Sequence, residues 1–291
     1  MAAVGLDAIL RALISGVLIG SIYSLVSMGL ALIWGVMDII NFAQGDFMIL
    51  GGFTAYLLLT GLGIDPLFGL PITFGVIFAL GVLTQIGIIE RILHAPPLSQ
   101  IFATFSLLLI IRYGMEVSLG PFTRRVVTDY SGIILRFGEF AVPLTQLVAF
   151  IISIAIAFLL YIFLTKTYTG IALRATAQDR MAAQLHGIDI KKMYRIAFGL
   201  GVGISAIGGV LFALSYPIHP ERGAYFCLLM FIIVVLGGFG SVFGAYVGGL
   251  IIGILQVLSA LFILPSLKDI VAFAVFIIIL LVKPTGLFGK S

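Results

Sequence analysis

The chain has 291 residues, of which 62% are hydrophobic and only 10% charged, and its formal net charge is +4. Soluble proteins carry roughly 25% charged residues, so this composition excludes a soluble domain and indicates a polytopic membrane protein. The basic residues stand at the ends of apolar runs, where membrane orientation accounts for them, and we expect no nucleic-acid partner. The single cysteine, Cys227, excludes an intramolecular disulfide.

The first apolar run, residues 8–33, is predicted to be a retained membrane span, with Gly16 and Gly20 at the spacing of closely packed helices. The next run, residues 34–59, carries four polar side chains where a plain span would have none: Asp38, Asn41, Gln44 and Asp46. Two interpretations are open, an ordinary loop between spans or a broken helix whose freed backbone lines a cavity.

We expect the broken helix, interrupted near Gln44 and Gly45, because glycine adopts the conformations that a break requires. Its polar groups are then predicted to line a solute path. Asn41 and Gln44 would bind freed backbone groups or a polar solute, and Phe42 would supply an apolar wall. Asp46 would either contact the solute or cap the second half-helix.

Further spans are predicted at residues 67–89, 101–119, 142–164 and 196–216. Arg112 and Glu116 lie four residues apart on one helical face, so they either pair or mark the membrane interface. Residues 120–139 form a loop of mixed charge that we expect on the outside.

Residues 166–195 form the longest polar stretch, with six basic side chains against Asp179 and Asp189. Short basic loops stay in the cytoplasm, and the other spans are oriented from this one. A helix is expected within residues 174–187, ended by Gly187, with an apolar stripe that includes Met181 and Leu185. This helix either rests on membrane lipid or docks into a groove of a soluble partner.

Residues 224–264 are too long for one span, and the sequence GGFGSVFG at 237–244 predicts two helices joined by a tight turn. Gly240, Gly244 and Gly248 recur every four residues and predict a smooth face for helix packing. A last span at 270–282 returns to Lys283 and Lys290, which places the C-terminus in the cytoplasm. The side of the N-terminus depends on whether residues 48–59 cross fully.

The ending GKS at residues 289–291 does not make a phosphate-binding loop, because the first glycine of that motif would fall at Pro284. The three histidines are scattered without metal-ligand spacing. We therefore expect no nucleotide site, catalytic residue, metal or cofactor in this chain.

Three segments carry a resemblance to a known family: INFAQGDFMILGG at 40–52, RATAQDRMAAQLHGID at 174–189, and VVLGGFGSVFGAYVGG with the closing KPTGLFG. The whole chain resembles the inner-membrane permeases of ATP-driven importers for branched-chain amino acids and related small solutes, among which urea or an amide is the alternative cargo. The family commonly has His at the position of Gln44 and Glu at that of Asp46, so both positions depart conservatively.

The resemblance implies one transmembrane permease domain over residues 1–291, all-α, with about 8–9 membrane helices, one broken helix and a cytoplasmic coupling helix. It implies a bacterial inner-membrane location, a second permease that is homologous but not identical, two cytoplasmic ATPases and a periplasmic solute-binding protein. It also favours docking of the loop at 166–195 onto an ATPase, with these residues at the contact: Arg174, Asp179, Arg180, Met181, Leu185 and Gly187.

The alternative function is an ion-coupled secondary transporter or channel for a small polar solute, which works without an ATPase. Such a protein would need a carboxylate near the membrane midplane and paired broken helices. Asp38 and Asp46 favour it, while the lack of a matching broken acidic segment in the second half argues against it.

Overall fold

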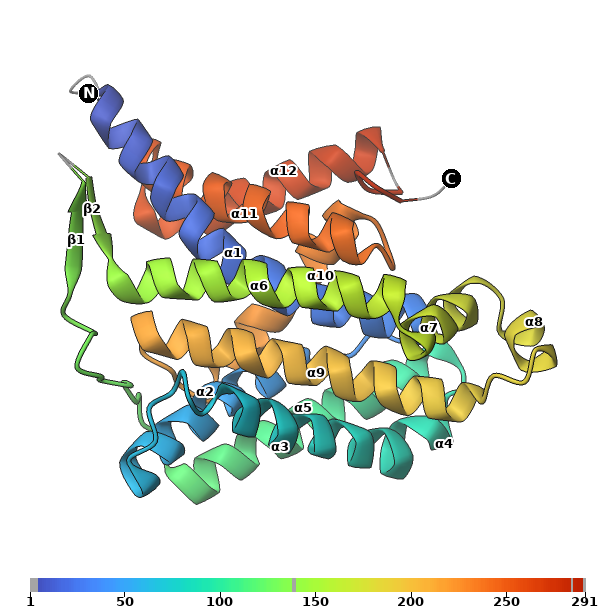
Figure 1. Ribbon diagram of the computed structural model, residues 1–291. Helices are drawn as coiled ribbons and strands as arrows, with labels where there is room; N and C mark the ends of the chain where they lie inside the picture. Colours follow the sequence, from blue (N-terminus) through green and yellow to red (C-terminus); the bar gives the residue numbers. More distant parts are fainter. Residues whose placement is uncertain (1–4, 138–139, 284, 290–291) are drawn as a thin grey trace.

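The computed structural model describes residues 5–137, 140–283 and 285–289; Pro284 and Lys290, which the sequence interpretation used, lie outside them. Helices make up most of the described structure, with one small hairpin, so the expected all-α polytopic fold is confirmed (Figure 1). The elements are α1 (Leu6–Met37), α2 (Gln44–Leu62), α3 (Leu70–Thr84), η1 (Gln85–Ile89), α4 (Glu90–Ile92), α5 (Pro97–Leu119), β1 (Ile134–Phe137), β2 (Phe140–Pro143), α6 (Leu144–Lys166), α7 (Tyr168–Gln178), α8 (Arg180–Leu185), α9 (Ile190–Ser215), α10 (Arg222–Gly237), α11 (Val242–Phe262), η2 (Pro265–Leu267) and α12 (Lys268–Val282).

Seven helices in the described residues are long and apolar enough to cross a membrane, the third being the continuous run Leu70–Ile92. α10 and α12 are shorter apolar helices of 16 and 15 residues. α2 has 19 residues, close to the ~20 that a full crossing needs. The structure therefore favours the interpretation in which residues 48–59, together with the residues before them that turn back from the end of α1, return the chain across the membrane.

The two ends of the bundle differ (Figure 1). The start of α1 lies with the hairpin β1–β2 at one end, called here the hairpin end. Helices α7 and α8 and the last turn of α12 lie at the opposite end, called here the α8 end. The start of α1 and the basic loop at residues 166–195 therefore lie at opposite ends. The chain crosses the bundle an odd number of times between them, α1 included.

The interruption after α1 lies at residues 38–43, not at Gln44 and Gly45 as predicted, because these two residues already form the first turn of α2. Asp38 ends α1 with a left-handed backbone at φ 57°. The Asn41 carboxamide oxygen then accepts a hydrogen bond from the Ala43 amide at 3.2 Å, a local turn that aspartate and asparagine favour. The break is encoded by these two polar side chains and not by the glycine.

Both halves of the bundle contain a helix that begins inside it. In the first half, residues 38–43 turn back from the α8 end, and α2 then starts beside the middle of α9. In the second half, residues 216–221 turn back from the hairpin end, and α10 then starts against α2. A Cβ on Gly45 would meet the Gly223 carbonyl oxygen, and one on Gly223 would lie 2.5 Å from the Asp46 carboxylate. α3 packs on α9 as α11 packs on α1. The segment α9–α11 thus repeats the arrangement of α1–α3 and runs through the bundle in the opposite direction.

Glycines bring α11 close to its neighbours. A Cβ on Gly20 would lie 3.0 Å from Leu250 of α11, which confirms the close packing expected for α1. Gly244 and Gly248 face α10, so their predicted helix-packing face contacts a helix of the same chain. Gly240 does not belong to this helix face, because it lies in the turn before α11 with φ +73°.

The predicted start of a span at residue 142 is wrong, because Val142 pairs with Leu135 in the antiparallel hairpin β1–β2. The helix α6 begins only after Pro143, which lacks the backbone N–H that would extend the ladder. Its 23 residues reach about 35 Å, enough to cross the hydrocarbon core.

An ion pair inside the bundle joins α2 to α5. Arg112 Nε and Nη2 donate to the two carboxylate oxygens of Asp46 at 3.1 and 3.2 Å. The side chains are 15% and 0% exposed respectively. The predicted alternative of an Arg112–Glu116 pair is not realised, because the guanidinium reaches the more deeply buried carboxylate on the neighbouring helix.

We predict that Asp46→Asn lowers the free energy of unfolding by about 3–5 kcal/mol, since it leaves the Arg112 charge without its buried partner. Thermal unfolding of the purified protein in detergent measures the effect. The same substitution in the exposed pair formed by Asp38 and Arg180 is the control and should change stability by less than about 1 kcal/mol. Equal effects at the two sites would contradict a structural role for the buried pair.

Candidate functional site

The predicted solute-path amides are engaged in bonds within the protein. Asn41 Nδ2 donates to Gln44 Oε1 at 2.8 Å, and Gln44 Nε2 donates to the Gly201 carbonyl at 3.1 Å and to Ser205 Oγ at 2.5 Å. Asn41 and Gln44 are fully buried. Buried polar groups need such partners, and these bonds tie the interruption at 38–43 to the middle of α9.

Of the four predicted path residues, two line a cavity. Asn41 and Phe42 contribute to an apolar cavity of about 300 Å³ between α1, α5 and α10, whose other walls include Phe105 and Phe231. Gln44 and Asp46 do not line it. Asp46 lies in the first turn of α2, one turn from the N-cap residue Ala43, and its carboxylate binds Arg112.

The expected single helix at 174–187 is two helices, α7 and α8, because Asp179 interrupts it. The backbone of Asp179 is extended, and its carboxylate accepts a hydrogen bond from the Ala182 amide at 3.0 Å, so it is the N-cap of α8. Gly187 follows α8 with φ +80°, the left-handed conformation that was expected at this helix end.

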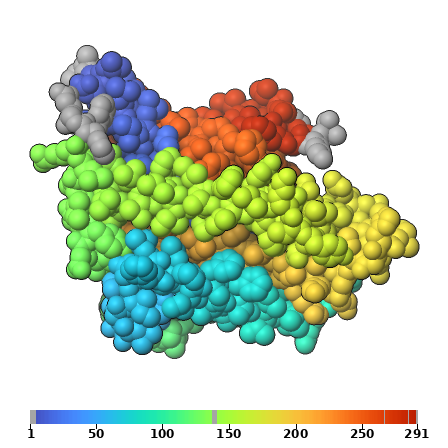
Figure 2. All heavy atoms as spheres, viewed as in Figure 1, coloured from blue at the N-terminus to red at the C-terminus, as the bar shows by residue number. Residues whose placement is uncertain are grey.

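Helix α8 projects from the end of the bundle, within the yellow region of Figure 2. Its Met181 and Leu185 side chains are 76% and 83% exposed. The helix is attached to the bundle through Arg180, whose guanidinium pairs with Asp38 and lies 5.7 Å from the centre of the Tyr194 ring. Arg174 on α7 is also exposed. The predicted coupling residues thus gather around α7 and α8, with α8 bound to the start of the interruption at 38–43.

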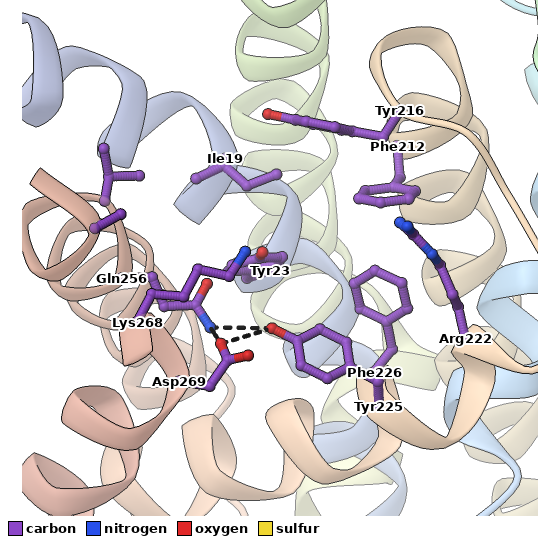
Figure 3. A pocket seen from close by; sticks show the side chains of 12 residues that line it. Ile19, Tyr23, Phe212, Tyr216, Arg222, Tyr225, Phe226, Gln256, Lys268 and Asp269 are labelled. Carbon is purple, nitrogen blue, oxygen red and sulfur yellow. Dashed lines mark hydrogen bonds between the residues drawn. The ribbon is translucent and has the colours of Figure 1, made fainter. Parts of the chain in front are cut away.

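Figure 3 shows a second cavity, which the sequence interpretation missed. It lies where α9 ends and where α10 and α12 begin, toward the hairpin end. It measures about 440 Å³ and is lined by five helices and Tyr216. Tyr225 donates its hydroxyl to Asp269 Oδ1 at 3.0 Å, and Gln256 Nε2 donates to the same oxygen at 2.8 Å. Arg222 and Lys268 also line the cavity. The sequence signals are the polar residues at the starts of α10 and α12, which are 46 residues apart in the chain, and Gln256 within the apolar run of α11.

The chain is similar to known proteins over nearly its whole length. The model of the family described as "Branched-chain amino acid transport system / permease component" matches residues 12–280. The high-affinity branched-chain amino acid transport system permease protein LivH of Escherichia coli (strain K12) is 30% identical, over 97% of this chain and 96% of that protein. The corresponding protein BraD of Pseudomonas aeruginosa is 28% identical over the same shares.

Among solved structures, PsaBC from Streptococcus pneumoniae in complex with Fab matches with a TM-score of 0.50 and 14% identity, covering 92% of this chain and 90% of that chain. This likeness concerns the fold alone. The family match extends over most of the chain and includes the interruption, the basic loop and the glycine turn. The chain therefore belongs to the branched-chain amino acid transport system permease family.

Proposed function

We propose that the chain is a permease subunit of an ATP-driven importer that moves branched-chain or related small amino acids across the bacterial inner membrane. It acts with a second, homologous but non-identical permease, two cytoplasmic ATPases and a periplasmic solute-binding protein. The observation that carries the proposal is α8, whose two exposed apolar side chains have no partner in the described residues and which is bound to the interruption at 38–43.

In this proposal the ATPases hydrolyse ATP and the permease contributes no nucleotide site. Met181 and Leu185 lie in a groove of one ATPase, in the manner of an amphipathic helix in a hydrophobic groove. Closure of the ATPases displaces α8. The ion pair of Arg180 with Asp38 passes this displacement to residues 38–43. In this segment Asn41 and Phe42 line the apolar cavity between α1, α5 and α10, called here the cavity at the α8 end. Asn41, Phe42, Gln44 and Asp46 remain the proposed solute-path segment, with Gln44 and Asp46 bracing it.

The alternative is a secondary transporter that needs no ATPase. One argument against it from the sequence is wrong, because residues 216–221 form a matching interruption in the second half. The remaining arguments still favour the importer. The Asp46 carboxylate is neutralised by Arg112, so it is not a free ion-coupling group at membrane depth, and the family consists of transport-system permeases.

Uptake into proteoliposomes tests the function directly. The complete complex with binding protein should take up L-leucine only with ATP inside, at the face that carries the ATPases, and leucine should stimulate ATP hydrolysis above its basal rate. A panel of amino acids, urea and acetamide identifies the solute. Uptake by the permease alone, driven by an ion gradient, would refute the importer and support the secondary transporter.

We predict that Leu185→Asp uncouples ATP hydrolysis from uptake, because an unpaired carboxylate in an apolar groove costs several kcal/mol. Transport should fall at least tenfold while the permease remains folded, since this side chain is exposed in the permease itself. Gln184→Asp, on the neighbouring exposed position, is the matched control and should transport normally. Normal coupling in Leu185→Asp would contradict the docking role.

Thiol labelling of intact cells tests the orientation in a protein whose buried Cys227 is replaced by alanine. We predict that a membrane-impermeant maleimide labels Asp7→Cys, at the exposed start of α1, in intact cells. Gln184→Cys on α8 should react only after the cells are broken, because the basic loop is cytoplasmic. The reverse pattern would invert the orientation of the whole bundle.

A further inference from the structure

The cavity at the hairpin end is separate from the proposed solute-path segment, since none of Asn41, Phe42, Gln44 and Asp46 lines it. Its walls come from α1, α9, α10, α11 and α12, and it lies near the end of α9 that is farthest from α8. Arg222 is exposed at the rim, whereas Gln256 is buried at the wall. In an importer oriented as proposed, this cavity belongs to the outer half of the membrane, where the solute arrives.

The charges around the cavity are incompletely paired. Asp269 accepts hydrogen bonds only from the uncharged donors of Tyr225 and Gln256. Among the described residues, neither Arg222 nor Lys268 has an ion-pair or side-chain hydrogen-bond partner. Figure 3 shows the Lys268 side chain extending toward Tyr23 and the Asp269 carboxylate turned toward Tyr225. The cavity thus presents one carboxylate and two cationic side chains, and none of the three forms an ion pair with another.

The remaining walls are apolar. Ile19, Phe212 and Phe226 face the cavity, together with Val257 and Ala260 of α11. A volume of about 440 Å³ falls within the range of roughly 300–1,000 Å³ typical of small-molecule sites, which combine apolar walls with a few placed polar groups. Two cations fit a ligand carboxylate, one carboxylate fits a ligand ammonium, and the apolar walls fit an aliphatic side chain.

We propose that this cavity binds the zwitterion of an aliphatic α-amino acid on its way through the permease. Arg222 and Lys268 hold the α-carboxylate, Asp269 accepts hydrogen bonds from the α-ammonium, and the wall between α1, α9 and α11 contacts the side chain. Tyr225 and Gln256 position the Asp269 carboxylate. The inference rests on the proposed import function, but it assigns the solute to residues that lie outside the interruption at 38–43.

A simple anion site explains the cavity less well. Two cations alone would suit a phosphate or a carboxylate, yet the Asp269 carboxylate stands in the same cavity and repels an anion that has no ammonium group. An aliphatic amine without a carboxylate would leave both cations unpaired. Both charges of the ligand are therefore needed, and they distinguish L-leucine from 4-methylpentanoate and from isoamylamine.

Ligand protection of a thiol tests the site without relying on transport. Ala260→Cys, in the assembled complex with Cys227 replaced by alanine, places a thiol in the cavity wall. L-Leucine should slow its reaction with a small maleimide, whereas 4-methylpentanoate and isoamylamine should not. Asp269→Asn keeps an oxygen for Tyr225 and Gln256 but loses the charge. It should raise the leucine concentration for half-protection about ten- to hundred-fold, as expected for the loss of a charged partner.

Arg222→Gln should weaken protection similarly, and because this side chain is exposed, its loss leaves the core intact. Glu221→Gln, next along the chain but outside the cavity lining, is the matched control and should protect like the parent. An unchanged labelling rate without leucine shows that the cavity has kept its shape. Equal protection by 4-methylpentanoate, or no protection while the same complex still takes up leucine, overturns the site and leaves the function standing. Protection without any ATP-driven uptake refutes the function and leaves the site.

Discussion

The contact between Gly45 and Gly223 is the constraint on which the interior depends. α2 and α10 both begin inside the bundle, and irregular backbone at membrane depth is stable only where protein surrounds it and satisfies its polar groups. Their first turns can cross because neither glycine has a side chain at this point. The amides of Asn41 and Gln44 then bind each other and the backbone of α9. A helix start without these partners would leave polar groups exposed to lipid.

The crossing also explains why two cavities exist. α10 contributes Arg222, Tyr225 and Phe226 to the cavity at the hairpin end, and Cys227, Leu228 and Phe231 to the cavity at the α8 end. One short helix therefore forms a wall of both. Because packed elements exchange between discrete arrangements, a small shift of α10 changes the two cavities together. In the proposed importer, this coupling would allow the cavity at the hairpin end to close as the cavity at the α8 end opens.

The sequence was sufficient for the spans and insufficient for the contacts. Apolar length located nearly every helix, and the glycine turn before α11 was recognised from its spacing. The helix predicted within residues 174–187 runs through Asp179, because the role of this residue as a cap depends on an extended backbone that no periodicity reveals. The sequence pattern offers Arg112 only Glu116 on its own helix, although its partner Asp46 is 66 residues away. The cavity at the hairpin end cannot be recognised from the sequence for the same reason, because its lining residues come from five helices that are far apart in the chain.

The two ion pairs of the α1–α2 region differ in a way that suits their proposed roles. Asp46 and Arg112 are largely buried, so breaking them would leave an uncompensated charge and they stay together. The side chains of Arg180 and Asp38 are 46% and 73% exposed, and such pairs contribute less than about 1 kcal/mol. The buried pair therefore holds α2 against α5, while in the proposed importer the exposed pair links residues 38–43 to the movement of α8.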